Sequence, residues 1–436
     1  MPIDDELAPL LQLEQEIVEA ARGFRLLSVL QWPDHVLERF LAGWRAGSPT
    51  IPEVSYELPE GLGDFTDQMD ALMQRAPQEH PLGDLLYKTA WSYSTAARML
   101  QSIGTPKFTE RSIELYGRPD QERVLQDWSD AEAAEFLLDK SGDLLSHCSV
   151  PPIDDDIDAE ILARRLKRRI DRHFVEDPIA VEVSPDIASK ASASSARVRL
   201  REGARFSELD LDQLFEHEVM VHAATMLNGR HQPHLDVLGL ASPRTTRTQE
   251  GLATLAELMT GSMDLVRLRR IALRVRAVAM ALDGADFIDV FRMFLDEGQS
   301  EEESAKSAAR VFRGGDPRGG ILFTKDGTYV AGMLEVHTFL RVAVRDGRPD
   351  LIPILFSGRL TLGDVVVVAP LAEAGLVRGP RYMPTWAADL RRLTATLAYG
   401  AFFQTFVDLD RATVEAAVDR EERMIEGSPA AEAGAE

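Results

Sequence analysis

Two histidines five residues apart constrain the fold of this chain more than any other feature. His217 and His222 stand in the run EHEVMVH, and Glu218 follows the first of them directly. Successive residues of an α-helix are about 100° apart around its axis, so a spacing of five leaves two side chains about 140° apart, whereas a spacing of four leaves them about 40° apart. A regular helix therefore cannot direct both imidazoles at one point. We predict a π-bulge between them, because such a bulge absorbs one residue and occurs mostly at functional sites.

A downstream acidic motif supplies what the two histidines lack for a metal site. The run TQEGLA at residues 248–253 reads as the start of a helix, which places Glu250 in its first turn. Two imidazoles, one carboxylate ligand and a second carboxylate beside the first imidazole are the parts of a catalytic zinc site. We predict one Zn²⁺ per chain, bound by His217, His222 and Glu250. Glu218 is the predicted general base.

Four motifs carry a family resemblance. In chain order, HEVMVH, NGRHQP, TQEGLATL and GGILFTKDGTYVAGMLEVHTFLR resemble the bacterial QEGLA-motif proteins named as flavohaemoglobin expression modulators, whose eukaryotic relatives are the microtubule-associated tyrosine carboxypeptidases. The resemblance spans roughly residues 50–405. It implies a zinc metallopeptidase with an HExxxH helix and a downstream glutamate ligand, which match His217, Glu218, His222 and Glu250 position by position. It indicates the site far better than the substrate.

Composition favours an ordinary protein of the cytoplasm. Of the 436 residues, 45% are hydrophobic and 27% charged, which suffices for a sizeable core. The apolar runs are shorter than the roughly 18 residues of a membrane span, and the acidic start lacks the basic region of a secretory signal. The one cysteine, Cys148, excludes an internal disulfide and fits a reducing compartment. We expect a cytoplasmic protein that does not contact membranes.

The charge balance restricts the partners. Seventy-one acidic and 48 basic residues give a net charge of −23, which argues against binding to nucleic acid or an anionic membrane. The same repulsion counts against an acidic peptide tail, although the eukaryotic relatives implied by the resemblance act on acidic tubulin tails. We therefore expect a substrate C-terminus in a neutral or basic region.

Periodicity predicts an α+β fold that is mostly helical. Period-two alternation occurs at residues 179–184 and 197–202, just before the helix that contains His217 and His222, which we call the metal helix. This order predicts a zincin-like lobe with a small β-sheet whose edge can bind an extended peptide; the alternative is a purely structural hairpin. We expect a helical N-terminal part at residues 1–150, the catalytic domain at 151–425 and a disordered tail at 426–436.

Further polar residues have predicted supporting roles. Asp326 and Gly327 predict a two-residue β-hairpin turn, which we place beside the active-site cleft expected around the metal. Tyr329 follows this turn and is predicted to donate a hydrogen bond that stabilises the transition state. Carboxypeptidase action also requires a cation for the terminal carboxylate of the substrate. The candidates for that role are Arg244, Arg247 and Lys325.

The helices after the metal helix contain two further candidates. Glu257 shares a helix face with Glu250 and is predicted to orient a histidine ligand; the alternative is a solvated or capping carboxylate. His337 lies on an apolar stripe, which favours a core or supporting histidine over a ligand. Thr248 is expected to cap its helix, and Gly251 to let that helix approach the metal helix closely.

These observations favour zinc-dependent peptide hydrolysis, most simply by a carboxypeptidase. Two alternatives stay open at this point. One is a non-catalytic regulatory protein that retains a zinc site, as the name "expression modulator" implies. The other is an aminopeptidase or endopeptidase that uses the same site. Glu218 counts against the first, because a purely structural zinc site needs no general base.

Overall fold

The computed structural model describes residues 7–123, 126–147, 156–185, 187, 190–194 and 196–406. The chain separates into two compact units, Met1–Thr385 and Trp386–Glu436. The predicted boundary near residue 150 and the predicted tail at 426–436 lie outside the described residues, so the division into an N-terminal part and a catalytic domain stays a prediction.

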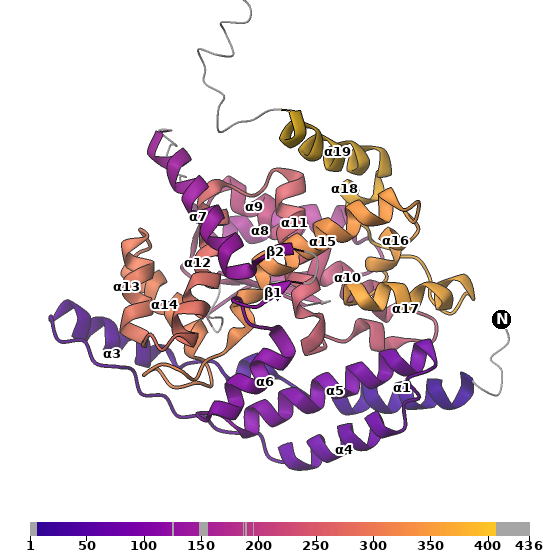
Figure 1. The fold of residues 1–436 in the computed structure, drawn as a ribbon, viewed down its shortest axis with the longest axis horizontal. Helices are drawn as coiled ribbons and strands as arrows, with labels where there is room; N and C mark the ends of the chain where they lie inside the picture. Colours follow the sequence, from indigo (N-terminus) through magenta and orange to yellow (C-terminus); the bar gives the residue numbers. More distant parts are fainter. Residues whose placement is uncertain are drawn as a thin grey trace, which may run out of the picture. The chain divides into compact units, whose positions relative to one another are not determined.

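Helices dominate both units, and the prediction of a mostly helical α+β fold is confirmed. The α-helices of the first unit before the metal helix are α1 (Leu7–Ala21), α2 (Leu26–Val29), α3 (Asp34–Arg45), α4 (Leu62–Gln74), α5 (Pro81–Gln101), α6 (Pro106–Tyr116), α7 (Asp130–His147), α8 (Ala159–His173) and α9 (Glu208–Leu214). The later helices are α10 (Ala224–Arg230), α11 (Thr246–Thr260), α12 (Leu265–Leu282), α13 (Phe287–Asp296), α14 (Glu301–Phe312), α15 (Thr328–Arg345), α16 (Leu351–Leu355), α17 (Leu362–Glu373), α18 (Thr385–Ala388) and α19 (Leu390–Phe406). Figure 1 shows α1, α4, α5 and α6 side by side, with α11 and α15 nearer the middle of the first unit.

The strands form three small sheets. In chain order they are β1 (Glu122–Arg123), β2 (Gln126–Ser129), β3 (Ile157–Asp158), β4 (Ala180–Ser184), β5 (Ala191–Ala193), β6 (Arg197–Arg201) and β7 (Arg205–Phe206). The pairs β1–β2 and β3–β7 are antiparallel, whereas the third sheet has the order β4-β6-β5, with β4 parallel and β5 antiparallel to β6. The two predicted strands are thus present, but parallel pairing makes them part of a three-stranded sheet rather than a hairpin.

The metal helix has the predicted distortion. A π-helix, η1 (Phe215–Ala223), continues α9 and runs on into α10. Ser207 caps this assembly, because its hydroxyl accepts from the Asp210 backbone while the Asp210 carboxylate accepts from the Ser207 backbone. The extra residue between the histidines is therefore absorbed within the helix, as predicted from their spacing.

Gly251 of α11 and Gly332 of α15 lie at the closest approach of these two helices. The prediction that Gly251 packs against the metal helix was wrong. A Cβ built on Gly251 would lie 2.1 Å from the carbonyl carbon of Gly332 on α15. Gly251 therefore lets α11 approach α15 rather than the metal helix. The predicted cap at Thr248 was also wrong, because α11 begins at Thr246, after the short 3₁₀ turn η3 (Pro243–Thr245). The approach of the two backbones leaves no room for any side chain at either glycine.

The predicted β-hairpin at Asp326 and Gly327 is not formed. Both residues belong to a buried 3₁₀ turn, η4 (Thr324–Gly327), which leads directly into α15. Gly327 has φ −70°, so it does not use the left-handed conformation that a two-residue hairpin turn requires. The Asp326 carboxylate is instead held by Arg310 of α14, at 2.5 and 2.7 Å. A buried ion pair has therefore overridden the local turn preference.

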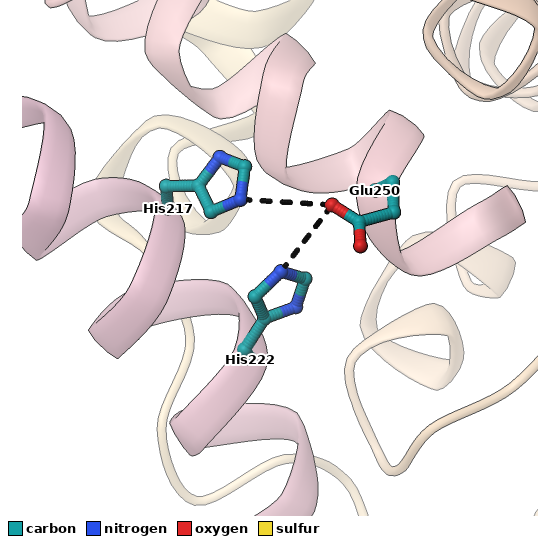
Figure 2. Close-up of side chains that lie close together, drawn as sticks. All are labelled: His217, His222 and Glu250. Carbon is teal, nitrogen blue, oxygen red and sulfur yellow. Dashed lines mark ion pairs between the residues drawn. The ribbon is translucent and has the colours of Figure 1, made fainter. Parts of the chain in front are cut away.

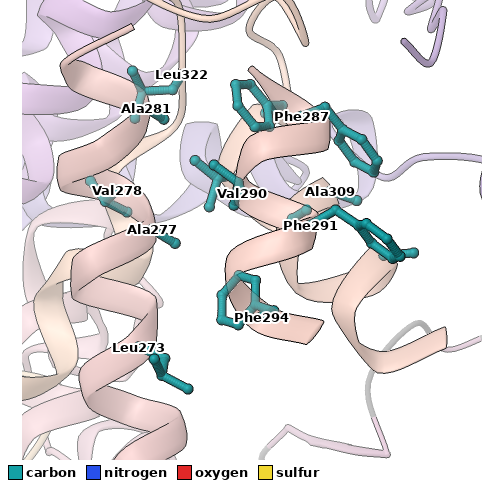
Figure 3. Close-up of a cluster of buried hydrophobic side chains, with 14 of the residues drawn as sticks. Leu273, Ala277, Val278, Ala281, Phe287, Val290, Phe291, Phe294, Ala309 and Leu322 are labelled. Atoms are coloured by element: carbon teal, nitrogen blue, oxygen red, sulfur yellow. The ribbon is translucent and has the colours of Figure 1, made fainter. Parts of the chain in front are cut away.

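An aromatic core fixes the position of α12. Figure 3 shows Phe287, Phe291 and Phe294 of α13 facing Leu273 and the small residues that follow it on α12. Burial of such side chains contributes about 1.5–3 kcal/mol each. The C-terminal turns of α12 are thereby committed to the core. Arg267, Arg270 and Arg274 lie nearer its N-terminus. None of the helices in the described part of the chain combines the length and the apolar character that crossing a bilayer requires.

Candidate metal centre

Three side chains from two elements converge on one point. Figure 2 shows His217 and His222 on the metal helix directed at Glu250 of α11. The Nε2 atoms of both histidines lie 3.8 Å from Oε2 of Glu250, and the three donor atoms lie within 4.8 Å of one another. Zinc bonds to nitrogen and oxygen are about 2.0–2.2 Å long, so one ion fits between donors at these separations. The group can therefore hold a metal ion.

The π-helix is what makes this convergence possible. The two imidazole rings lie 4.9 Å apart between centroids and are nearly perpendicular, at 87°. In a regular helix the two side chains would diverge by about 140°. The chain thus uses a less stable local backbone to bring two nitrogen donors together, which is a common use of π-helical turns.

Glu257 orients one of the two histidines. Its Oε1 lies 2.6 Å from Nδ1 of His217, and Arg267 of α12 donates to both of its oxygens, at 3.1 and 3.2 Å. Although burial alone would raise it, Arg267 and His217 lower the pKa of Glu257 to about 2, so this buried carboxylate is ionised. An ionised acceptor at Nδ1 fixes the tautomer in which Nε2 is left to bind a metal. No such partner is present at His222, whose Nδ1 is buried without a hydrogen bond within the described residues.

Lys325 contacts the third donor. Its Nζ donates to Oε1 of Glu250 at 2.9 Å, so the two oxygens of that carboxylate face different partners. Burial would raise the pKa of Glu250, but Lys325 and the two histidines hold it well below its usual range. Lys325 was predicted to bind a substrate carboxylate. In the structure it contacts Glu250 and lines the cleft, and that role stays a prediction.

The donors lie in a cleft with a cavity volume of about 510 Å³. Glu218 and Tyr329 both line it, as do residues 190–193 at and beside β5. The Tyr329 ring lies close to two cations: the guanidinium carbon of Arg274 is 4.8 Å and Nζ of Lys325 5.5 Å from its centroid. The cleft therefore contains a carboxylate and a phenol in addition to the three donors.

The lining of this cleft has the opposite sign to the whole chain. Of 28 lining residues, five are acidic and ten are cationic, and the latter come from β6, α12, α14 and the segments around them. The cationic residues are Lys190, Arg201, Arg267, Arg270, Arg274, Lys306, Arg310, Arg313, Lys325 and Arg359. A concave site lined by one sign of charge concentrates ligands of the other sign. The site is thus suited to anions.

Comparison with known proteins identifies the family. The family model described as "microtubule-associated tyrosine carboxypeptidase" matches residues 38–405. The chain belongs to the microtubule-associated tyrosine carboxypeptidase family. A search of curated proteins returned no match. The resemblance drawn from the sequence is thereby confirmed at the level of this family.

Three predicted residues lie away from the centre in this family member. Arg244 pairs with Asp364 at 2.9 Å, Arg247 donates to the Tyr116 carbonyl at 2.7 Å, and neither lines the cleft. His337 is half-buried on α15 and is also absent from the lining. The predicted roles of all three residues stay predictions.

Sequence reasoning missed the arginines that do line the cleft of this tyrosine carboxypeptidase relative. Arg267, Arg270 and Arg274 recur at spacings of three and four on α12, nearer its N-terminus than most of the residues that pack against α13. That spacing is the available signal, because it places three cations along one side of a helix. The sequence does not say which cleft that side faces.

Proposed function

We propose that this protein is a zinc-dependent carboxypeptidase with a zincin-like active site. The observation that carries the proposal is the convergence of His217, His222 and Glu250 in a cleft that also contains Glu218. Two imidazoles and one carboxylate suit Zn²⁺ and leave a coordination position open, as in catalytic sites. Zinc, when bound, supplies a Lewis acid that polarises the scissile carbonyl and acidifies a water.

The remaining work belongs to residues of the chain. Glu218 takes the proton of the attacking water and returns it to the leaving amine, since it follows a ligand directly and lines the cleft. Tyr329 donates a hydrogen bond to the oxyanion that develops on the scissile carbonyl. Its neighbours Arg274 and Lys325 favour negative charge near the phenol. Removal of one such donor typically costs about 10²- to 10³-fold in rate.

The proposed substrate is the C-terminus of an acidic peptide or protein. The net charge of the chain predicted a neutral or basic substrate. The ten cationic and five acidic residues of the cleft, however, would contact a bound peptide directly, and they favour an acidic one. The repulsion from distant surface charges falls off within a screening length of about 8–10 Å. The main chain of the peptide is proposed to lie along β5, which is an edge strand of the described sheet and lines the cleft.

The test is digestion of a peptide library that contains acidic, neutral and basic C-termini. Release of C-terminal residues from acidic peptides supports the proposal. Trimming from the amino end, or cleavage of internal bonds, would make the protein an aminopeptidase or endopeptidase. The absence of any cleavage by zinc-loaded protein would favour a regulatory role.

Two variants connect the activity to the site. His222→Ala is expected to lose the zinc that the wild type binds at about one per chain. Glu218→Gln is expected to retain zinc and fold, while its turnover falls by at least about 10²-fold. Glu303→Gln is the matched control, because Glu303 lines the same cleft but pairs with Arg270 instead of standing beside a ligand. Equal turnover in Glu218→Gln and wild type would remove the general base from the mechanism.

A further inference from the structure

Three arginines in the cleft make no ion pair with any described carboxylate: Arg274 of α12, Arg313, which follows α14, and Arg359. Arg274 and Arg313 are both near Asp326, whereas the carboxylates near Arg359 are Glu218 and Glu250. The nearest carboxylate, Asp326, is fully used: its two oxygens accept from Nε and Nη2 of Arg310, at 2.5 and 2.7 Å. Three guanidiniums therefore share one carboxylate, which leaves a surplus of two positive charges.

Burial makes that surplus costly. Nε of Arg313 is inaccessible to solvent and has no hydrogen-bond acceptor in the described part of the chain. Burial, with the neighbouring Arg310, lowers the pKa of Arg313 to about 10 and also lowers that of Arg274. Both side chains are half-buried, and cations that are partly removed from water without a partner are normally compensated by an anion. The other cleft arginines on α12 are already paired, Arg267 with Glu257 and Arg270 with Glu303.

The two arginines face one region of the cleft. The Arg274 guanidinium stacks over the Tyr329 ring, and the Tyr329 hydroxyl lies 3.5 Å from Nη2 of Arg310. Arg313 is close enough to Arg310, Asp326 and Tyr329 to feel the charge of each. Tyr329 lines the same cleft as the proposed metal site, and Lys325, which contacts Glu250, lies 5.5 Å from the centre of its ring.

We propose that Arg274 and Arg313 form a subsite for two carboxylates, and that the residue released by the enzyme is itself acidic, a C-terminal glutamate or aspartate. The inference rests on the proposed carboxypeptidase function and adds the identity of the terminal residue. Such a residue carries an α-carboxylate and a side-chain carboxylate, which match the two surplus charges. An aromatic terminal residue supplies only one carboxylate and leaves the second guanidinium, which is half-buried, without a partner.

The experiment measures binding, so that it does not depend on cleavage. Zinc-loaded Glu218→Gln is titrated with four fluorescent peptides that differ only at the last residue: Glu or Gln, each with a C-terminal carboxylate or amide. We expect the loss of either carboxylate to weaken binding about tenfold or more, since a hydrogen bond to a charged group contributes about 1.5–3 kcal/mol. Equal affinity for the Glu and Gln peptides would overturn the proposal. A Glu preference without any cleavage by the wild type would retain the subsite and reject the hydrolase.

Matched variants assign the two charges. Arg274→Met and Arg313→Met should each abolish one of the two carboxylate preferences. Arg270→Met is the control, because it lies one turn from Arg274 on the same side of α12 and lines the same cleft but already has a partner. The assignment is wrong if Arg270→Met loses the Glu preference and the other two variants keep it.

Discussion

Lys325 and Glu250 form a buried ion pair in which Nζ donates to Oε1 at 2.9 Å, while Oε2 of the same carboxylate faces His217 and His222. One oxygen of Glu250 is thus held by a cation and the other is directed at the proposed metal position. The pair fixes the carboxylate in an orientation suited to binding through a single oxygen.

Replacement of Lys325 by Met should therefore weaken zinc binding. We expect a loss of about tenfold or more in affinity, because contacts that orient a ligand typically contribute a factor of 10–100. Competition with a chromophoric chelator measures the affinity. Lys306→Met is the control, since Lys306 lines the same cleft without a contact to a proposed ligand. Equal affinity of Lys325→Met and wild type would contradict the assigned role.

Glu257→Gln should weaken zinc binding through His217. Glutamine keeps the shape of the side chain but removes the charge that accepts from Nδ1 at 2.6 Å. The expected loss is about 10- to 100-fold. Glu335→Gln removes a carboxylate that pairs with Arg247 away from the cleft and should leave the affinity unchanged. The same competition assay reports both variants, and a similar loss in the two would point to a general effect of charge.

Gly251→Ala should be strongly destabilising. The added methyl group would lie 2.1–2.5 Å from three atoms of Gly332, so the helices α11 and α15 must separate. We expect a loss of about 3 kcal/mol in the free energy of unfolding, measured with urea. Gly63→Ala on α4 meets no atom within 4 Å and should instead be stabilising by about 0.5–1 kcal/mol. An unchanged stability in Gly251→Ala would disprove the close approach.

Glu14 should make stability depend on pH. It lies on α1, is buried, and accepts from the Val237 backbone at 2.6 Å. Burial raises its pKa from 4.5 to about 7, so the folded state favours the neutral form. The contribution of Glu14 to stability is fully present below about pH 4.5 and is lost as the pH rises through 7.

Glu14→Gln should remove that dependence. Glutamine is neutral at every pH, so the variant should be more stable than the wild type at pH 8, by on the order of 3 kcal/mol at most, and similar to it at pH 4.5. Urea unfolding at the two values tests the expectation. Glu16→Gln, on a more exposed side of the same helix, should not remove the difference in the free energy of unfolding between pH 4.5 and pH 8.

The donors of the site were predictable from the sequence because each depends on short-range spacing. Two histidines five positions apart need a π-helical turn if both are to face one point from a single helix. The turn at Asp326 and Gly327 was not predictable, because its partner Arg310 stands on a different helix and outweighs the local preference. The packing partner of Gly251 was missed for the same reason, since a glycine does not reveal which backbone it meets.

Charge was the least predictable property. The net charge of −23 is a property of the whole chain, whereas the charge of a cleft depends on which few side chains the fold brings together. The spacing of Arg267, Arg270 and Arg274 indicated one cationic side of a helix. Which cleft that side enters depends on how α12 packs against α13, and that packing cannot be read from the spacing of the arginines.

The π-helix also changes the register of everything that follows it. One extra residue turns each later side chain by about 100° around the axis relative to a helix that starts at the same place with histidines four apart. Leu227 and Asn228 of α10 are buried in this rotated frame, and Asn228 bridges the Phe356 and Tyr382 backbones. An alignment that forces the common four-residue spacing onto this chain would match the catalytic residues on one side of the insertion and exchange inward for outward positions on the other. The extra residue therefore determines which positions of α10 face the core in this chain.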